Sequence, residues 1–292
     1  MTALTRPGAA GGPGGPVGAL GPGRLGGSPP RPLPSAPPVG GWHIFEKDLL
    51  VFRRSWFSYL LSGLSQPFLY LVSMGVGLGL YVNRNGDALG GISYIAYVAP
   101  ALLVTQAMMA AAFESAWPIF NKIEWDKTYI AALNTPVGVG DLLRGDLAWI
   151  GFRSILLATL FLVVIVALGA AASPLVVLTI PVALLTALSF SAPIMALTAT
   201  MKTEGGFNAL FRFGITPLFL FSGTFFPIER LPLFLQPAAL VTPLYHGVAL
   251  ARSLSLGQID PIGWLVHAAA LSAFFVAGYL AASVAFRRRM VV

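Results

Sequence analysis

Residues 216–247 read TPLFLFSGTFFPIERLPLFLQPAALVTPLYHG, and this stretch decides the fold. It is apolar enough to enter a bilayer, but it is interrupted by Pro227, Pro232, Pro237 and Pro243. The pieces between these prolines are four or five residues long, whereas a membrane-spanning helix needs about 20 residues. Proline also removes a backbone donor and disfavours helix in the residue before it. The stretch therefore predicts a re-entrant element, because non-helical backbone at membrane depth survives only inside protein or beside a water-filled cavity.

The composition is that of a membrane protein. Of the 292 residues, 56% are hydrophobic and 10% are charged, and the mean hydropathy is +0.78, outside the range of ordinary soluble domains. The absence of cysteine excludes a disulfide, a thiolate nucleophile and a thiolate metal site. No cluster of His, Asp and Glu has the spacing of metal ligands, so neither a metal nor another cofactor is expected.

The net charge of +7 does not indicate nucleic-acid binding. The basic residues lie at the ends of apolar runs, where they orient a membrane protein, and they form no basic face with interleaved aromatic residues. We therefore expect membrane lipid, and no nucleic acid, among the partners.

The N-terminal region differs in composition from the rest of the chain. Residues 1–41 hold 12 Gly and 10 Pro and no acidic residue. Such a segment cannot bury enough apolar surface to offset its ordering entropy, so a disordered tail is expected there. Residues 42–292 are expected to form one transmembrane domain.

Residues 42–56, WHIFEKDLLVFRRSW, alternate apolar and charged side chains at helical spacing. The pattern predicts an amphipathic helix in the membrane interface. A plain extension of the first membrane span is the alternative.

Six apolar segments are expected to cross the membrane: residues 57–82, 92–116, 147–170, 174–200, 207–226 and 262–286. Eleven Lys and Arg residues fall on one side of these spans, and only Arg84, Arg230 and Arg252 fall on the other. The excess of positive charge marks the cytoplasmic side. The expected fold is therefore an all-α, multi-pass membrane protein with six helices, both termini in the cytoplasm, and re-entrant helices between spans five and six.

The loop between the second and third spans has an unusual composition. Residues 117–146 read WPIFNKIEWDKTYIAALNTPVGVGDLLRGD, and the centre mixes charged with aromatic and apolar side chains before stopping at Asn134-Thr135-Pro136. This pattern predicts a short amphipathic helix over residues 123–133. Its apolar side either docks on a soluble partner or rests on the bilayer, and spacing alone does not decide between them.

Three segments resemble ABC-2 type permeases, specifically their lipo-oligosaccharide, or nodulation-factor (NodJ-like), branch. They are WDKTYIAALNTPV at residues 125–137, QPFLYLVSMGVGLG at residues 66–79, and the block at residues 207–256. The resemblance covers about residues 42–289.

The resemblance implies roles for particular positions. The residues that would couple to an ATPase are Glu124, Trp125, Asp126, Lys127, Tyr129 and Leu133. The residues of an outer gate would be Phe225, Phe226, Pro227, Pro243 and His246. The interface helix at residues 42–56 would flank the ATPase, and a second permease subunit, as in a homodimer, would complete the conduit. Because the sequence contains no G-x-x-x-x-G-K-[ST] pattern, ATP hydrolysis is expected on a partner chain, and this chain is not expected to be an enzyme.

Glu114 is a further candidate, near the cytoplasmic end of the second span. A carboxylate within an apolar run is costly and is by default a functional candidate. It either lines the transport pathway or is neutralised by pairing with Arg153.

Together these features predict the permease subunit of an ATP-binding cassette exporter in the plasma (inner) membrane. Its substrate would be amphipathic: a glycolipid, a lipo-oligosaccharide or a drug. One alternative is a secondary transporter driven by an ion gradient, although such proteins usually show internal repeats and titratable residues at the bilayer midplane. The other is an intramembrane serine hydrolase using Ser222 with His246 or His267.

Overall fold

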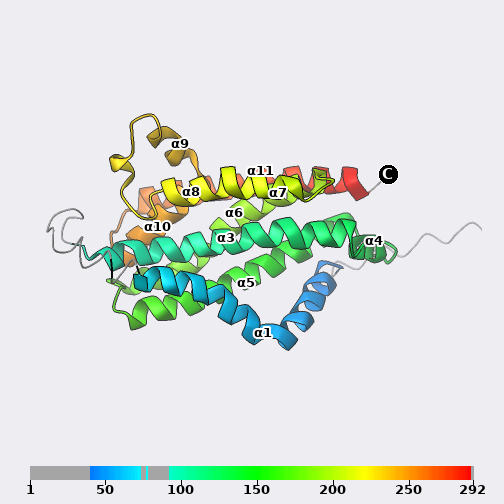
Figure 1. Cartoon of the computed structure of the whole chain (residues 1–292), viewed down its shortest axis with the longest axis horizontal. Helices are drawn as coiled ribbons and strands as arrows, with labels where there is room; N and C mark the ends of the chain where they lie inside the picture. The colour runs from blue at the N-terminus through cyan, green and yellow to red at the C-terminus, as the bar shows by residue number, and fades with distance from the viewer. Residues whose placement is uncertain (1–39, 74–76, 78–91, 291–292) are drawn as a thin grey trace, which may run out of the picture. The chain divides into compact units, whose positions relative to one another are not determined.

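The computed structural model describes residues 40–73, 77 and 92–290, and every described element is helical (Figure 1). The all-α prediction is therefore confirmed. In chain order the elements are α1 (Gly40–Val72), α3 (Tyr94–Glu124), α4 (Thr128–Leu133), α5 (Val139–Ala167), η2 (Pro174–Leu178), α6 (Thr179–Thr200), α7 (Gly205–Ala209), η3 (Leu210–Ile215), α8 (Thr216–Phe221), η4 (Ile228–Arg230), α9 (Gln236–Val241), α10 (Pro243–Leu256) and α11 (Pro261–Met290). Of the predicted disordered tail, residues 1–39 lie outside the described part, and residues 40 and 41 open α1.

Within the described residues, four helices are long and apolar enough to cross a membrane: α3, α5, η2 continued by α6, and α11. They correspond to the second, third, fourth and sixth predicted spans. The predicted boundaries at residues 116 and 147 do not mark helix ends, since α3 continues to Glu124 and α5 begins at Val139. Hydropathy locates the part of a helix that lipid surrounds, and a helix can continue beyond it into water. Most of the predicted loop 117–146 is therefore helical.

The first and fifth predicted spans are not among these four helices. Residues 74–76 and 78–82 of the first lie outside the described part of the chain. The fifth, residues 207–226, is not one helix: α7, the π-helical η3 and α8 follow one another, and helix stops at Phe221.

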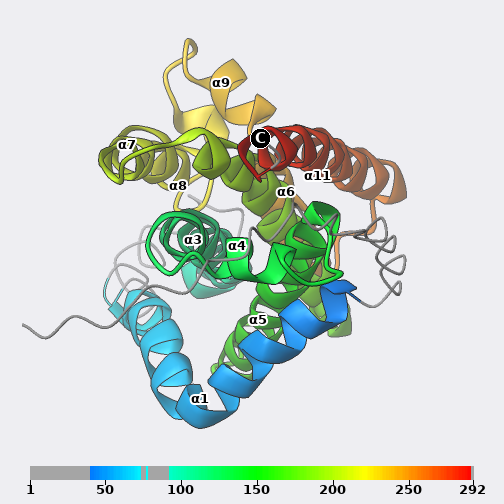
Figure 2. The same ribbon diagram turned by 90° about the vertical axis from the view of Figure 1, so that its right-hand side faces the viewer.

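A kink divides α1 into two arms (Figure 2). The backbone leaves helical geometry at Ser55, with φ −123° and ψ 15°, at the end of the predicted interface helix. The first arm packs on α5 through aromatic rings: the Phe45 ring centroid lies 5.8 Å from that of Phe152, and that of Phe52 lies 5.8 Å from that of Trp149. The predicted interface helix and the start of the first span are thus one bent element.

Glycine allows the first arm of α1 to approach α5 closely. A Cβ atom on Gly145 would lie 2.6 Å from Ile44 Cβ and 2.7 Å from the backbone oxygen of Gly41. Because one of these atoms belongs to the backbone, the two helices could not accommodate a larger residue without separating.

The proline-interrupted region is broken as its sequence predicts. After Phe221 the chain turns at Gly223, whose φ of +79° is a conformation that suits glycine. Short η4 and α9 follow before α10. With 14 residues, α10 is about 21 Å long, too short to span a bilayer. This region lies at the opposite end of α3 from α4 (Figure 1).

The close contact at Gly145 can be tested with one methyl group. We expect Gly145→Ala to lower the free energy of unfolding by about 1–3 kcal/mol, because overpacking shifts α1. Reversible unfolding in mixed micelles measures this change. Gly205→Ala is the matched control, since a Cβ there meets no atom within 4 Å. Equal stability of the two variants would contradict the tight α1–α5 crossing.

Candidate functional site

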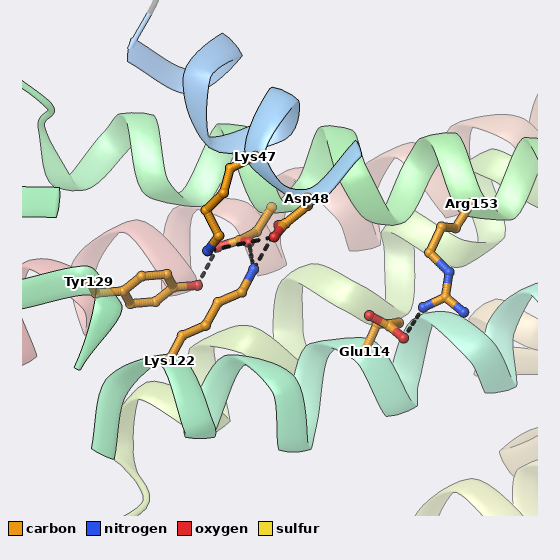
Figure 3. A network of polar contacts seen from close by, with 7 residues as sticks. Lys47, Asp48, Glu114, Lys122, Tyr129 and Arg153 are labelled. Atoms are coloured by element: carbon orange, nitrogen blue, oxygen red, sulfur yellow. Dashed lines mark hydrogen bonds and ion pairs between the residues drawn. The ribbon is translucent and has the colours of Figure 1, made fainter. Parts of the chain in front are cut away.

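Side chains from four helices meet near the α4 end of the structure (Figure 3). Lys122 Nζ on α3 donates to Asp48 Oδ2 on α1 at 2.8 Å and to Asp146 Oδ1 on α5 at 2.5 Å. Tyr129 Oη on α4 donates to the other oxygen of Asp146. We call Asp48, Lys122, Tyr129 and Asp146 the Lys122 cluster. It joins α1, α3, α4 and α5 by hydrogen bonds and ion pairs.

The Lys122 cluster is shielded from water. The Asp146 side chain is 1% exposed and that of Lys122 is 15% exposed. Buried charges are costly unless they are paired and hydrogen-bonded, and removing one partner leaves the other uncompensated. The half-exposed Lys47 lies 3.7 Å from Asp48 and brings a second positive charge. The two carboxylates are thus balanced by two ammonium groups.

Tyr129 acts in this cluster as a fixed donor. Burial raises the pKa of the Tyr129 hydroxyl well above its usual value, and the adjacent Asp146 carboxylate raises it further. The hydroxyl therefore stays protonated and its bond to Asp146 persists at physiological pH. Tyr129 consequently points inward and anchors α4.

The turn before α4 decides which residues face outward. Lys127 has a left-handed backbone, with φ +50°, which ends the run from α3 and starts α4 in a new direction. The predicted single helix over residues 123–133 is therefore wrong in its first half. Trp125, in the turn before α4, is 70% exposed, and Ile130 on α4 is 50% exposed. We call these two exposed apolar side chains the α4 surface.

The six residues proposed for ATPase coupling divide into two groups. Trp125, Asp126 and Lys127 are exposed, whereas Tyr129 is buried and Leu133 is partly buried against the core. Glu124 ends α3 and accepts a hydrogen bond from Arg289 at the end of α11. Of the six residues, Trp125, Asp126 and Lys127 are therefore the ones most open to contact with another molecule.

A second ion pair lies further along α3. Arg153 on α5 donates to Glu114, which is the pairing that the sequence left open (Figure 3). Glu114 is eight residues from Lys122, or about 12 Å along the helix. The pair lines a cavity of about 320 Å³ between α1, α3, α5 and η3, together with Gln106 and Phe211. Polar groups therefore face an otherwise apolar cavity.

Arg252 connects three segments at the end of the structure opposite α4. From α10, its Nη2 donates to the Gly223 carbonyl at 2.7 Å and its Nε to the Tyr97 carbonyl at 3.2 Å. The guanidinium also lies 3.7 Å from the centroid of the Tyr97 ring, a cation–π geometry. Arg252 thus joins α10, the break after α8, and α3. The sequence analysis used Arg252 only to assign the topology. A single arginine within a short apolar helix was nevertheless a sign that its side chain has a specific polar partner.

The residues proposed for an outer gate surround this break. The Phe225 ring lies 5.0 Å from that of Phe219, and Phe226 packs against a small apolar cluster containing Ile228. Pro227 precedes η4, and Pro243 occupies the first turn of α10. His246 Nδ1 on α10 lies 2.9 Å from His267 Nδ1 on α11, so one ring donates to the other.

The contacts of Ser222 do not support a hydrolase. Its hydroxyl donates to the Leu218 carbonyl at 2.6 Å and lies 3.3 Å from Thr242 Oγ1. A serine nucleophile would need a histidine in that place, and His246 is paired with His267 instead.

Among the described residues, no three His, Cys, Asp or Glu side chains come together to hold a metal ion.

Removing the central ammonium should destabilise the structure. We expect Lys122→Met to lower the free energy of unfolding by about 3 kcal/mol, because the buried Asp146 loses its cation and Asp48 keeps only the half-exposed Lys47. Lys122→Met combined with Asp146→Asn should recover part of this loss. Unfolding in mixed micelles measures each variant, and Lys127→Met, at an exposed position, is the control. A cluster that contributes nothing would give the same stability for Lys122→Met and this control.

Comparison with known proteins identifies the family. The model of the ABC-2 type transporter family matches residues 41–256. Nodulation protein J of Rhizobium leguminosarum bv. trifolii is 32% identical over 247 residues, which is 85% of this chain and 92% of that protein. Nodulation protein J of Rhizobium meliloti (strain 1021) is 30% identical over 260 residues, 88% of this chain and 97% of that protein. The matched residues include α4, all four residues of the Lys122 cluster and the broken region through α10, so the chain belongs to the ABC-2 type transporter family of membrane permeases.

Proposed function

We propose that the chain is the transmembrane permease subunit of an ATP-binding cassette exporter, powered by a separate cytoplasmic ATPase subunit. The α4 surface is the observation that carries this proposal. Trp125 and Ile130 are exposed within four residues of the buried, hydrogen-bonded Tyr129, so exposed apolar side chains belong to a segment that is anchored to the core. Membership of the ABC-2 type family supports a partner of this kind, and the sequence contains no nucleotide-binding P-loop pattern of its own.

The Lys122 cluster gives this proposal a mechanism. Movement of a docked ATPase would push on α4. Because Tyr129 and Lys122 both bind Asp146, and Lys122 also binds Asp48, the push would reach α5 and α1 together. The bonded helices would then move as a rigid body, and part from a second permease subunit, which we take to be an identical chain.

The proposed topology has six spans. The four long apolar helices would be joined by one span continuing from α1 and one formed by α7, η3 and α8. The excess of Lys and Arg at the α4 end, including Arg287–Arg289 on α11, would place this end and both termini in the cytoplasm of an inner-membrane protein. Residues 42–292 would form the transmembrane domain, and Gly40 and Gly41 already belong to its first helix, α1.

On this topology, the broken region lies on the outer side. Its short helices would be re-entrant, and Phe225, Phe226, Pro227, Pro243 and His246 would form the outer gate. Arg252 would hold the gate closed through the Gly223 carbonyl, since a single side chain there joins three segments.

The substrate would be an amphipathic molecule moved outward: a glycolipid, a lipo-oligosaccharide or a drug. Two observations support this class. The relatives are named for nodulation, the branch that the sequence resembles. The cavity beside Glu114 combines an ion pair and the Gln106 amide with aromatic walls, which suits a molecule with a polar end and an apolar end.

The α4 surface can be tested through ATPase binding. We expect the double variant Trp125→Ala/Ile130→Ala to weaken binding of the ABC ATPase that co-purifies with the wild type by roughly a hundredfold, because apolar anchors at interfaces contribute most of the affinity. The control Leu233→Ala/Ile259→Ala removes exposed apolar residues from the other end. If no ABC ATPase co-purifies with the wild type, the proposed function fails. Unchanged affinity of the α4 variant would overturn only the docking surface.

The role of Glu114 can be separated from its structural contribution. We expect Glu114→Gln to reduce both stability and ATP-driven export, because it leaves Arg153 uncompensated. The neutral pair Glu114→Gln/Arg153→Met should restore stability but leave export reduced at least about tenfold if the polar groups contact the substrate. Export from inverted vesicles measures this, with Lys202→Met, at an exposed position, as control. Full export by the neutral pair would show a structural role only.

A further inference from the structure

A second cavity, distinct from the one beside Glu114, opens between four helices. It has a volume of about 670 Å³ and lies between the first arm of α1 and helices α5, α6 and α11. Its walls are mostly apolar, with Phe152, Leu188 and Phe275 among them. Trp42 and Arg144 line the same cavity. We call it the α5 groove.

The α5 groove is polar at one end and apolar at the other. Along α5, the lining residues run from Asp141 and Arg144 through Ala148 and Phe152 to Ile155. This spacing keeps them on one face of the helix. The change from charged to apolar along that face is the change that a lipid molecule shows from headgroup to acyl chain.

The depth of the groove matches one leaflet of a bilayer. Its deepest residues are Ile155 on α5, Leu184 on α6 and Phe275 on α11, which lie 16, 16 and 15 residues from the ends of their helices on the α4 side, at Val139, Thr200 and Met290. At 1.5 Å per residue these depths are about 24, 24 and 22 Å, so three helices agree. From Arg144 to Ile155 the groove runs about 17 Å, against about 15 Å for half a hydrocarbon core.

Arg144 presents a cation at the mouth of the groove. Its side chain is 63% exposed, whereas its partner Asp141 is only 11% exposed. Asp141 is turned inward, where it also accepts from the Gly138 backbone N–H. Within the described structure, the guanidinium donates to Gly140 O and Asp141 Oδ1, which leaves donors of its five N–H groups for an anion. The exposed Trp42 indole beside it suits the headgroup level of a membrane.

We propose that the α5 groove binds one phospholipid from the leaflet at the α4 end, with its phosphate on Arg144 and one acyl chain reaching Phe275. Basic pockets between transmembrane helices at the cytoplasmic side bind anionic lipid headgroups for this reason. The bound lipid contacts both α1 and α5, so it supports the first arm of α1 where Phe45 lines the groove. This inference does not depend on the identity of the exported substrate.

Photo-crosslinking of the wild-type chain tests the position of the lipid directly. The probe is a phosphatidylglycerol with a diazirine at the end of one acyl chain, added to the full-length protein in nanodiscs. We expect labelled peptides to contain Leu184, Leu188 or Phe275 well above the level at Val163, an exposed apolar residue of α5 outside the groove. Labelling spread evenly over lipid-facing residues, Val163 included, would overturn the proposal.

Retention of lipid after detergent washing tests the two ends of the site separately. We expect one phospholipid per wild-type chain by native mass spectrometry. Leu188→Trp should fill the groove and remove it, whereas Val163→Trp should not. Arg144→Gln should weaken retention of phosphatidylglycerol roughly tenfold by removing a charge-assisted hydrogen bond, with retention of diacylglycerol unchanged. Equal retention by all variants, or a parallel loss of both lipids in Arg144→Gln, would contradict the phosphate site.

Discussion

Lys122 brings a positive charge to a place where two carboxylates are shielded from water, and the geometry around it follows from this pairing. Its ammonium group can bind both Asp48 and Asp146 only if α1 and α5 both approach α3 at this point. The second oxygen of Asp146 then requires its own donor, which Tyr129 provides. The position of α4, and with it the outward direction of Trp125, is thus a consequence of satisfying buried charge.

Helix α3 connects the two ends of the structure. It contributes Lys122 near one end, Glu114 in the middle, and Tyr97 near the other. Tyr97 and Lys122 are 25 residues apart, about 38 Å along the helix. The bonds differ in kind: at the α4 end ion pairs join continuous helices, whereas Arg252 binds the backbone carbonyl of a broken segment. A movement imposed at the α4 end would therefore be expected to deform the broken segment beside Arg252, where the backbone is least regular.

Much of the fold was readable from the sequence, because hydropathy and proline act locally. The prolines between residues 216 and 247 predict the short pieces that follow Phe221. The break of the fifth segment into α-helix and π-helix was not predictable from its apolar composition. Helix ends were also misplaced, since charged residues such as Glu124 can extend a helix beyond the membrane by pairing, here with Arg289.

The site was only partly predictable, since pairing depends on tertiary contacts. Glu114 and Arg153 were recognisable because each is a charge in an apolar run, and the structure pairs them. Tyr129 was expected to contact an ATPase, yet its side chain is buried, because the turn at Lys127 starts α4 in a new direction. Nothing in the spacing of Asp48 relative to Lys122, 74 residues apart, indicated that they meet.

The central claim is that the Lys122 cluster makes α4 rigid with α1 during ATPase action. The chain has no cysteine, so spin labels can be placed at two engineered positions, Val51→Cys on α1 and Ala131→Cys on α4, both exposed. Their separation, measured by pulsed electron spin resonance in the complex with the ATPase, should be the same with and without ATP. In the same samples the distance between Ala131→Cys labels on paired subunits should change. A shift of α4 relative to α1 on ATP binding, with the subunits fixed, would contradict the account.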